Sequence, residues 1–136
     1  MYFFLSQRGE NVIKDWLMRE RVPKDQVAAF QDKIDTLELS GPEMVPGFIT
    51  ETPVARDVYK MKVKGNKGRK QLRPLCCRGP FGSKEYTILV GATEKDSKLV
   101  PKDVKQRAQN HLAELRTDPS RRKRERLTGE SSPRVQ

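Results

Sequence analysis

Eight cations and no acidic residue lie in one short window of the chain, between residues 60 and 78. The whole chain carries 28 Lys and Arg against 18 Asp and Glu, a formal net charge of +10, so this window can account for most of the excess. A local surplus of positive charge is typical of a surface that binds phosphate, because neutralising phosphates releases condensed counterions. The sequence therefore predicts a cationic surface for RNA or another polyanion, made by Lys60, Lys62, Lys64, Lys67, Arg69, Lys70, Arg73 and Arg78.

The residue pattern around the first lysines indicates how they are presented. Over residues 58–64 apolar residues alternate with lysines, which predicts a strand with one apolar face and one cationic face. We expect no acidic residue across from these lysines, and like charges that face each other cost stability unless an anionic ligand compensates. Arg73 falls in the otherwise apolar stretch 71–77, where a charge is costly unless it opens into a site. A solvated face that serves only solubility is the competing interpretation.

Such a set of side chains could cleave RNA without a metal ion, with the 2′-hydroxyl as the nucleophile. That reaction needs a base for the hydroxyl, positive charge for the phosphorane and a proton for the leaving oxygen. Crowded lysines can supply the base, because neighbouring cations lower the pKa of a lysine. An arginine can stabilise the phosphorane with its fixed fork of donors.

Neither a metal ion nor another cofactor is expected. The chain has one histidine, His111, which we expect to be a packing or surface residue. Cys76 and Cys77 are adjacent, so they lack the CxxC spacing of a metal site and are predicted to be buried strand residues without a disulfide. No glycine-rich phosphate loop precedes a helix, which argues against nucleotide hydrolysis.

Apolar periodicity and turn residues predict the elements that must position the cationic surface. Asn11 is expected to cap a first helix that buries Trp16, and Pro101 to open a last helix. Pro74 lacks an N–H group and predicts a bulge in its strand. Hairpin-length loops make the last three strands antiparallel. In chain order the elements are a strand at residues 2–5, the first helix, a second helix at 23–39, strands at 58–64, 71–77 and 86–90, and the last helix.

This order predicts an α+β fold: a small twisted antiparallel sheet with an N-terminal helical hairpin and a C-terminal helix. We assign residues 1–117 to one domain and expect residues 118–136, which are basic and lack apolar periodicity, to be a disordered tail. The apolar run at residues 2–5 is too short for a signal peptide or a membrane span, so we expect a cytoplasmic protein with no membrane contact.

Several of these motifs resemble the RelE/HigB superfamily of type II toxin–antitoxin toxins, in particular its phage-derived HigB-like branch. The similarity covers about residues 2–115. It rests on the helical pair that contains Trp16, the run VYKMKVKG from Val58 to Gly65, and the run LRPL from Leu72 to Leu75. The stretch from Leu89 to Ala108 is also similar to the closing strand and final helix of that family.

The resemblance implies a RelE-like fold and a ribosome-dependent endoribonuclease that cleaves mRNA without a metal. It implies that Lys60, Lys62 and Arg73 are catalytic, and that Lys95 and Lys98 add basic contacts to RNA. The remaining cations of the window, Lys64, Lys67, Arg69, Lys70 and Arg78, would bind the RNA backbone. The implied partners are mRNA, the ribosome and a cognate antitoxin of the helix-turn-helix type.

A second hypothesis comes from a different functional class. Residues 92–100 contain no Tyr or His, whereas many family members place a base-stacking or acid residue there. The same fold would then serve a phage or prophage protein that binds nucleic acid without cleaving it, or a toxin that inhibits gyrase. Removing single cations separates the two, because a binder loses affinity gradually and an enzyme loses its reaction.

Overall fold

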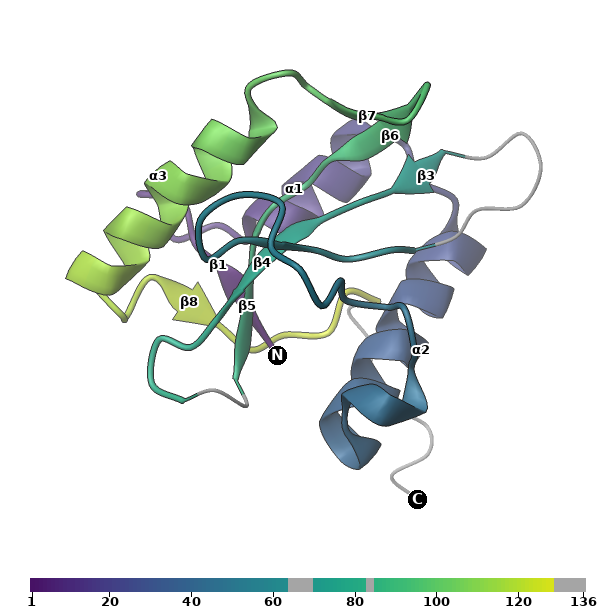
Figure 1. Ribbon diagram of the computed structural model, residues 1–136, viewed down its shortest axis with the longest axis horizontal. Helices are drawn as coiled ribbons and strands as arrows, with labels where there is room; N and C mark the ends of the chain where they lie inside the picture. The colour runs from purple at the N-terminus through teal and green to yellow at the C-terminus, as the bar shows by residue number, and fades with distance from the viewer. Residues whose placement is uncertain (64–69, 83–84, 129–136) are drawn as a thin grey trace.

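The computed structural model describes residues 1–63, 70–82 and 85–128 (Figure 1). Within these ranges the fold is α+β, as the sequence predicted, and no helix is long and apolar enough to cross a membrane. In chain order the elements are β1 Tyr2–Phe4, α1 Val12–Arg19, α2 Lys24–Ser40, the 3-10 helix η1 Pro42–Met44, β2 Tyr59–Lys60, β3 Gln71–Leu72, β4 Leu75–Arg78, β5 Tyr86–Val90, β6 Thr93–Lys95, β7 Lys98–Val100, α3 Val104–Thr117 and β8 Arg122–Lys123.

Five strands form the main sheet, in the order β2-β4-β5-β1-β8. The pairs β2–β4 and β4–β5 are antiparallel, as predicted. The prediction of a wholly antiparallel sheet is wrong, because β1 pairs with β5 in parallel. The chain passes through both N-terminal helices and two further strands of this sheet between β1 and β5, so no tight hairpin fixes the direction of β1.

A smaller, three-stranded sheet has the order β3-β6-β7. It arises because the strand expected at residues 71–77 divides at Arg73 and Pro74 into β3 and β4, and the register shifts between Leu75 and Cys76. The hairpin β6–β7 was not predicted from the sequence. Its turn residues Asp96 and Ser97 have φ of 52° and 64°, the left-handed pair that two-residue hairpin turns require.

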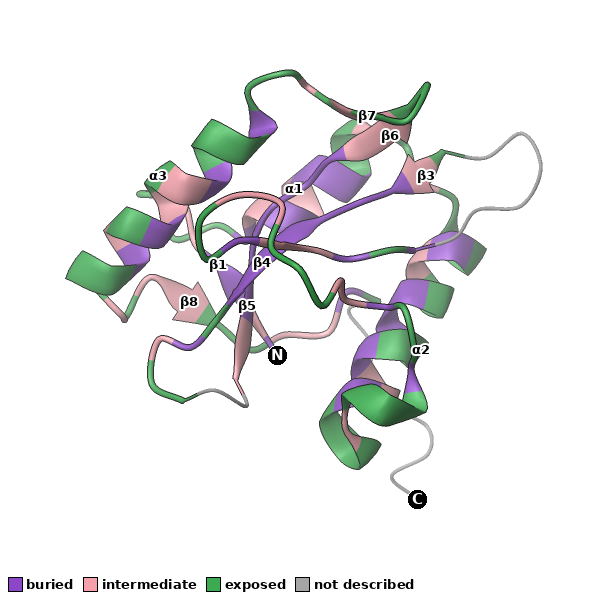
Figure 2. Ribbon diagram, viewed as in Figure 1, coloured by how far each residue is buried: buried purple, intermediate pink, exposed green. Residues whose placement is uncertain are grey.

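Helices cover both faces of the main sheet, and each face has its own apolar core (Figure 2). On one face α1 and α2 pack against Phe3, Cys76 and Ile88. On the other face α3 packs against Leu75 and Leu89. Over Phe3–Phe4, Leu75–Cys77 and Ile88–Leu89 neighbours along the strand therefore point into different cores, which fixes the register.

The helix boundaries follow local chemistry. The Oδ1 atom of Asn11 accepts from the backbone N–H of Ile13 at 2.9 Å, which confirms the predicted cap of α1. Helix α2 ends before Gly41, whose φ of +88° suits a glycine. The predicted helical hairpin is seen only as two successive helices, because α2 runs away from α1 instead of alongside it (Figure 1).

Residues 118–128 form an ordered segment, which we call the C-terminal strap, so the prediction of a disordered tail is wrong for them. Within it β8 pairs with β1, and Leu127 is buried. Arg126 contacts both carboxylate oxygens of Asp35 on α2 at 3.2 Å, and Glu125 accepts from Lys14 on α1 at 2.8 Å. The four arginines of the strap thus each form an ion pair with an acid elsewhere in the fold, Arg121 with Glu114, Arg122 with Glu85, Arg124 with Glu38 and Arg126 with Asp35. Residues 129–136 lie outside the described ranges.

Candidate nucleic-acid interface

Lys60 and Arg73 are held on neighbouring segments of the main sheet. Lys60 pairs with Leu75 across β2 and β4, and its backbone N–H donates to Oγ1 of Thr50 at 3.1 Å. Arg73 lies in the break between β3 and β4, where its backbone N–H donates to the carbonyl of Ala92 at 2.8 Å. Its side chain is only 10% exposed and donates through Nη1 to the carbonyl of Leu72 at 2.9 Å. The sequence predicts that Arg73 opens into a site, whereas the structure shows its guanidinium to be almost fully buried.

The structure places a carboxylate between these two cations. Oε1 of Glu94 on β6 lies 3.5 Å from Nζ of Lys60 and 3.6 Å from Nε of Arg73. The expectation that no acid faces the lysines is therefore wrong. We call Lys60, Arg73 and Glu94 the Lys–Arg–Glu cluster. It has one net positive charge, and its Lys60 and Glu94 side chains are 20% and 28% exposed, so it is open to solvent at one side.

Glu94 reaches this position because β6, which begins directly after Ala92, pairs with β3, which ends directly before Arg73. Ala92 accepts from Arg73, and residues two apart on a strand share a face, so Glu94 points to the same face as Ala92. That face is the one with the α3 core, where Ala92 is buried. A local pattern could have suggested the β6–β7 hairpin, since Asp96 and Ser97 separate two short strand-like runs of residues. The contact between Glu94 and Arg73 has no such local signal in the sequence.

Lys62, the third residue predicted to be catalytic, is exposed and points elsewhere in the described structure. Its backbone N–H donates to the carbonyl of Phe48 at 2.8 Å. With Lys33 of α2 and Phe48 it lines a pocket of about 350 Å³. The structure therefore brings Lys60 and Arg73 together at Glu94 and leaves Lys62 at the edge of the sheet.

Two of the predicted backbone-binding cations have other partners. Lys70 contacts Oε1 of Glu20, the residue that ends α1, at 2.7 Å. The Arg78 guanidinium lies over the Tyr59 ring, 4.9 Å from its centroid. Arg78 follows Cys77, whose side chain is in the α3 core, so Arg78 lies on the opposite face of the main sheet from the Lys–Arg–Glu cluster. Lys64, Lys67 and Arg69 lie outside the described residues.

Lys95 and Lys98 face each other across the turn of the β6–β7 hairpin, and both are exposed. Glu94 and Leu99 form the adjacent pair, and Leu99 packs against the α3 core. Because side chains alternate along a strand, Lys95 and Lys98 point to the other face of the hairpin from Glu94. They are therefore separated from the cluster by the thickness of this small sheet.

The other chemically versatile side chains are packing residues. His111 stacks on Phe4 at 4.4 Å between ring centroids, and its Nδ1 lies 2.7 Å from the carbonyl oxygen of Leu89. Cys76 and Cys77 are buried free thiols, as predicted, and burial raises the pKa of the Cys77 thiol to about 11. Within the described ranges, no three His, Cys, Asp or Glu side chains gather as the ligands of a metal ion would.

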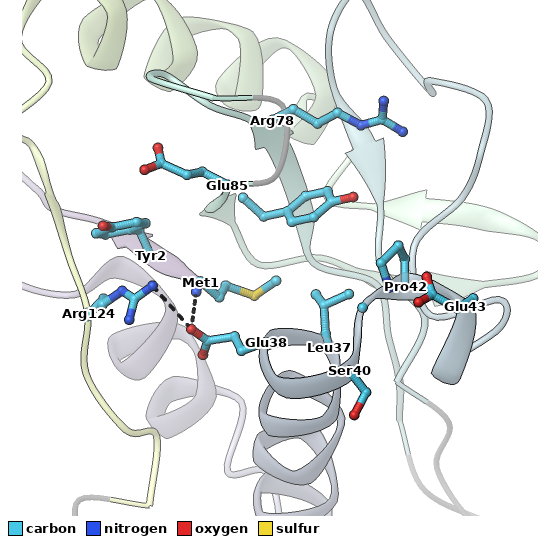
Figure 3. A pocket seen from close by; sticks show the side chains of 12 residues that line it. Met1, Tyr2, Leu37, Glu38, Ser40, Pro42, Glu43, Arg78, Glu85 and Arg124 are labelled. Atoms are coloured by element: carbon cyan, nitrogen blue, oxygen red, sulfur yellow. Dashed lines mark ion pairs between the residues drawn. The ribbon is translucent and has the colours of Figure 1, made fainter.

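A larger cleft of about 680 Å³ opens between the end of α2 and the ends of β4 and β5 (Figure 3). Figure 3 shows Glu38 between the Met1 amino group, at 2.7 Å, and Arg124 of the strap, at 3.5 Å. Arg78 is on the wall of this cleft, and no member of the Lys–Arg–Glu cluster lines it. Several charged side chains that line this cleft are thus already bound in ion pairs within the fold.

No family model, curated protein or solved structure matches this chain.

Proposed function

We propose that this protein is a metal-independent endoribonuclease, the toxin of a type II toxin–antitoxin system of the RelE/HigB kind. The observation that supports it best is the Lys–Arg–Glu cluster, in which two cations from different strand segments converge beside a carboxylate on a partly open face. An ammonium, a guanidinium and a carboxylate are together sufficient for cleavage by the 2′-hydroxyl, because they provide charge, a proton donor and a proton acceptor.

In this proposal each cation has a distinct task. The guanidinium of Arg73 is fixed by its bond to the Leu72 carbonyl, so it offers preorganised donors to the phosphorane. The Lys60 ammonium, which is partly exposed, donates a proton to the leaving 5′ oxygen. Lys62 and the exposed cations Lys95 and Lys98 lie farther out and would contact more distant parts of the RNA.

The proposal extends to the setting in which cleavage occurs. By the resemblance of its motifs, the substrate is mRNA on the ribosome, in the cytoplasm. An antitoxin of the helix-turn-helix type would neutralise the protein by covering the cationic face. The net charge of +10 favours association with the ribosome, because ribosomal RNA is a dense polyanion.

Controlled expression followed by mapping of mRNA 5′ ends tests the proposal, and purified protein can be assayed with and without ribosomes. We expect Lys60→Met and Arg73→Lys each to lower the cleavage rate about 10²–10³-fold, the usual effect of removing one transition-state donor. The matched control is Lys105→Ala, which removes an exposed cation from α3, and it should cleave like the wild type. Intact mRNA after expression of the wild-type protein would exclude a nuclease.

A protein that binds nucleic acid without cleaving it, including a toxin that inhibits gyrase, is the second candidate. The observation that favours it is that Glu94 neutralises part of the charge of Lys60 and Arg73. A binder of this kind should leave mRNA intact, and its affinity should decrease by a similar factor with each cation removed. Its dependence on salt should become weaker with each such substitution.

A further inference from the structure

We propose that Glu94 is the general base that removes the proton from the 2′-hydroxyl, an assignment that rests on the proposed ribonuclease function. The sequence pattern favours a lysine for this task, because crowded cations promote loss of a lysine proton. The structure adds a carboxylate to that crowd, and an ionised carboxylate is an acceptor only, whereas an ammonium and a guanidinium are donors only. Within the Lys–Arg–Glu cluster, Glu94 is therefore the side chain suited to accept a proton.

Both contacts of Glu94 are longer than the protein's tightest ion pairs, although Arg124–Glu38 at 3.5 Å and Arg121–Glu114 at 3.7 Å are as long. Glu94 lies 3.5 Å and 3.6 Å from its two cations, whereas Glu20 and Lys70 are 2.7 Å apart and Glu85 and Arg122 are 2.9 Å apart. Charge-assisted bonds of full strength are about 2.7–2.9 Å long. Glu94 therefore makes no short charge-assisted bond with either cation.

Arg73 provides an independent sign that the cluster awaits a ligand. Its side chain is nine-tenths buried, and its Nε atom has no hydrogen-bond partner among the described residues. A buried guanidinium N–H without a partner is costly, because it has lost its bond to water. Nε is itself buried, so a phosphate oxygen would satisfy that donor only after neighbouring side chains shift, and the same phosphate would bring the 2′-hydroxyl next to Glu94.

Glu94 also has the accessibility that a base needs. Both of its contacts with the cluster cations fall on Oε1, and among the described residues no hydrogen bond or ion pair is made by Oε2. The side chain is 28% exposed, so a ribose can approach it from solvent. Lys60 and Arg73 both lie within 4 Å of this carboxylate.

The proposed step balances in protons and bonds. Glu94 takes the proton of the 2′-hydroxyl, and O2′ attacks the adjacent phosphorus to form a phosphorane whose charge faces Arg73. The bond from phosphorus to the 5′ oxygen then breaks, and Lys60 gives its proton to that oxygen. The products are a 2′,3′-cyclic phosphate and a 5′-hydroxyl end. Solvent returns the proton to Lys60 and removes the one on Glu94.

The test compares wild type with Glu94→Gln, which keeps the shape and an acceptor oxygen but cannot take the proton. Single-turnover cleavage of a 5′-labelled mRNA is measured on bacterial ribosomes and on the RNA alone, together with the affinity for the same RNA. We expect the cleavage rate to fall about 10²–10⁴-fold, the usual effect of losing a general base. The affinity should stay equal or rise, because a negative charge has been removed beside two cations.

If Glu94 has no part in proton transfer, Glu94→Gln cleaves RNA as fast as the wild type. That result would overturn the assignment of the base while leaving the ribonuclease function intact. A wild-type protein that cleaves neither substrate would overturn both. If Glu94→Gln does not fold, as read from Trp16 fluorescence, the wild-type pH profile decides: the rate must fall in acid while the protein stays folded, and a rate independent of acid overturns the proposal.

Discussion

Replacing Leu127 with alanine tests whether the C-terminal strap is part of the folded domain. The Leu127 side chain is buried in the core beneath α2, at 8% exposure, and its backbone N–H donates to Oε1 of Gln31 at 2.8 Å. A buried Leu→Ala change costs about 2–5 kcal/mol. Leu127 keeps 8% of its surface exposed, so we expect about 2 kcal/mol, at the lower end of that range.

Urea denaturation followed by tryptophan fluorescence measures this loss directly. Trp16 is the one tryptophan of the chain and is buried in the same core, so its emission reports unfolding. The melting temperature should fall by about 5–10 °C for a chain of this size. The control is Leu39→Ala on α2, where the leucine is 88% exposed, and it should change the free energy of unfolding by less than about 0.5 kcal/mol.

Equal unfolding curves for Leu127→Ala and Leu39→Ala would refute the reasoning. The strap would then contribute nothing to the fold in solution, and the ion pair between Arg126 and Asp35 would have no role in stability. A loss well above the range for a single buried leucine would also be informative, since it would mean that the whole strap detaches when its apolar anchor is removed.

Two further substitutions probe the packing and the charges of the fold. Gly91→Ala should destabilise the protein by about 1–3 kcal/mol, because an added Cβ would overlap the Trp16 ring, whereas Gly82→Ala, with open space at that position, should unfold like the wild type in urea. Glu125 has its pKa lowered by the hydrogen bond from Lys14, so its stabilising effect is present above its ordinary pKa of 4.5 and is lost as the pH falls below that value. The urea midpoint of the wild type should therefore fall more steeply in acid than that of Glu125→Gln, and parallel curves would contradict this.

Local signals allowed the sequence to predict much of the fold. The cap at Asn11, the strand Tyr86–Val90 and the apolar stripe of α3 each depend on residues close together in the chain, and each is present. The last helix begins at Val104 and not at Pro101, because residues 101–103 form a turn whose Pro101 carbonyl accepts from the N–H of Val104. Such shifts of a few residues at element ends leave the packing unchanged.

The sequence could not predict features that depend on distant partners. Glu94 joins the candidate site only because β3 pairs with β6, and no pattern around Glu94 indicates that pairing. The strap has the composition of a disordered tail, yet acids on α2 and β-strand pairing with β1 hold it in place. Composition describes a segment by itself, whereas its order here depends on charges placed elsewhere in the chain.

The position of β1 has a consequence for how the chain folds during synthesis. This strand is made well before its two neighbours in the sheet, β5 and β8. Contacts between segments so far apart are slow to form, because a long loop must close before they are gained. The main sheet cannot be completed until Arg122 and Lys123 have left the ribosome, so the apolar strand β1 stays without its sheet neighbours until β5 and β8 have been made. During that interval the growing chain is exposed to aggregation through β1.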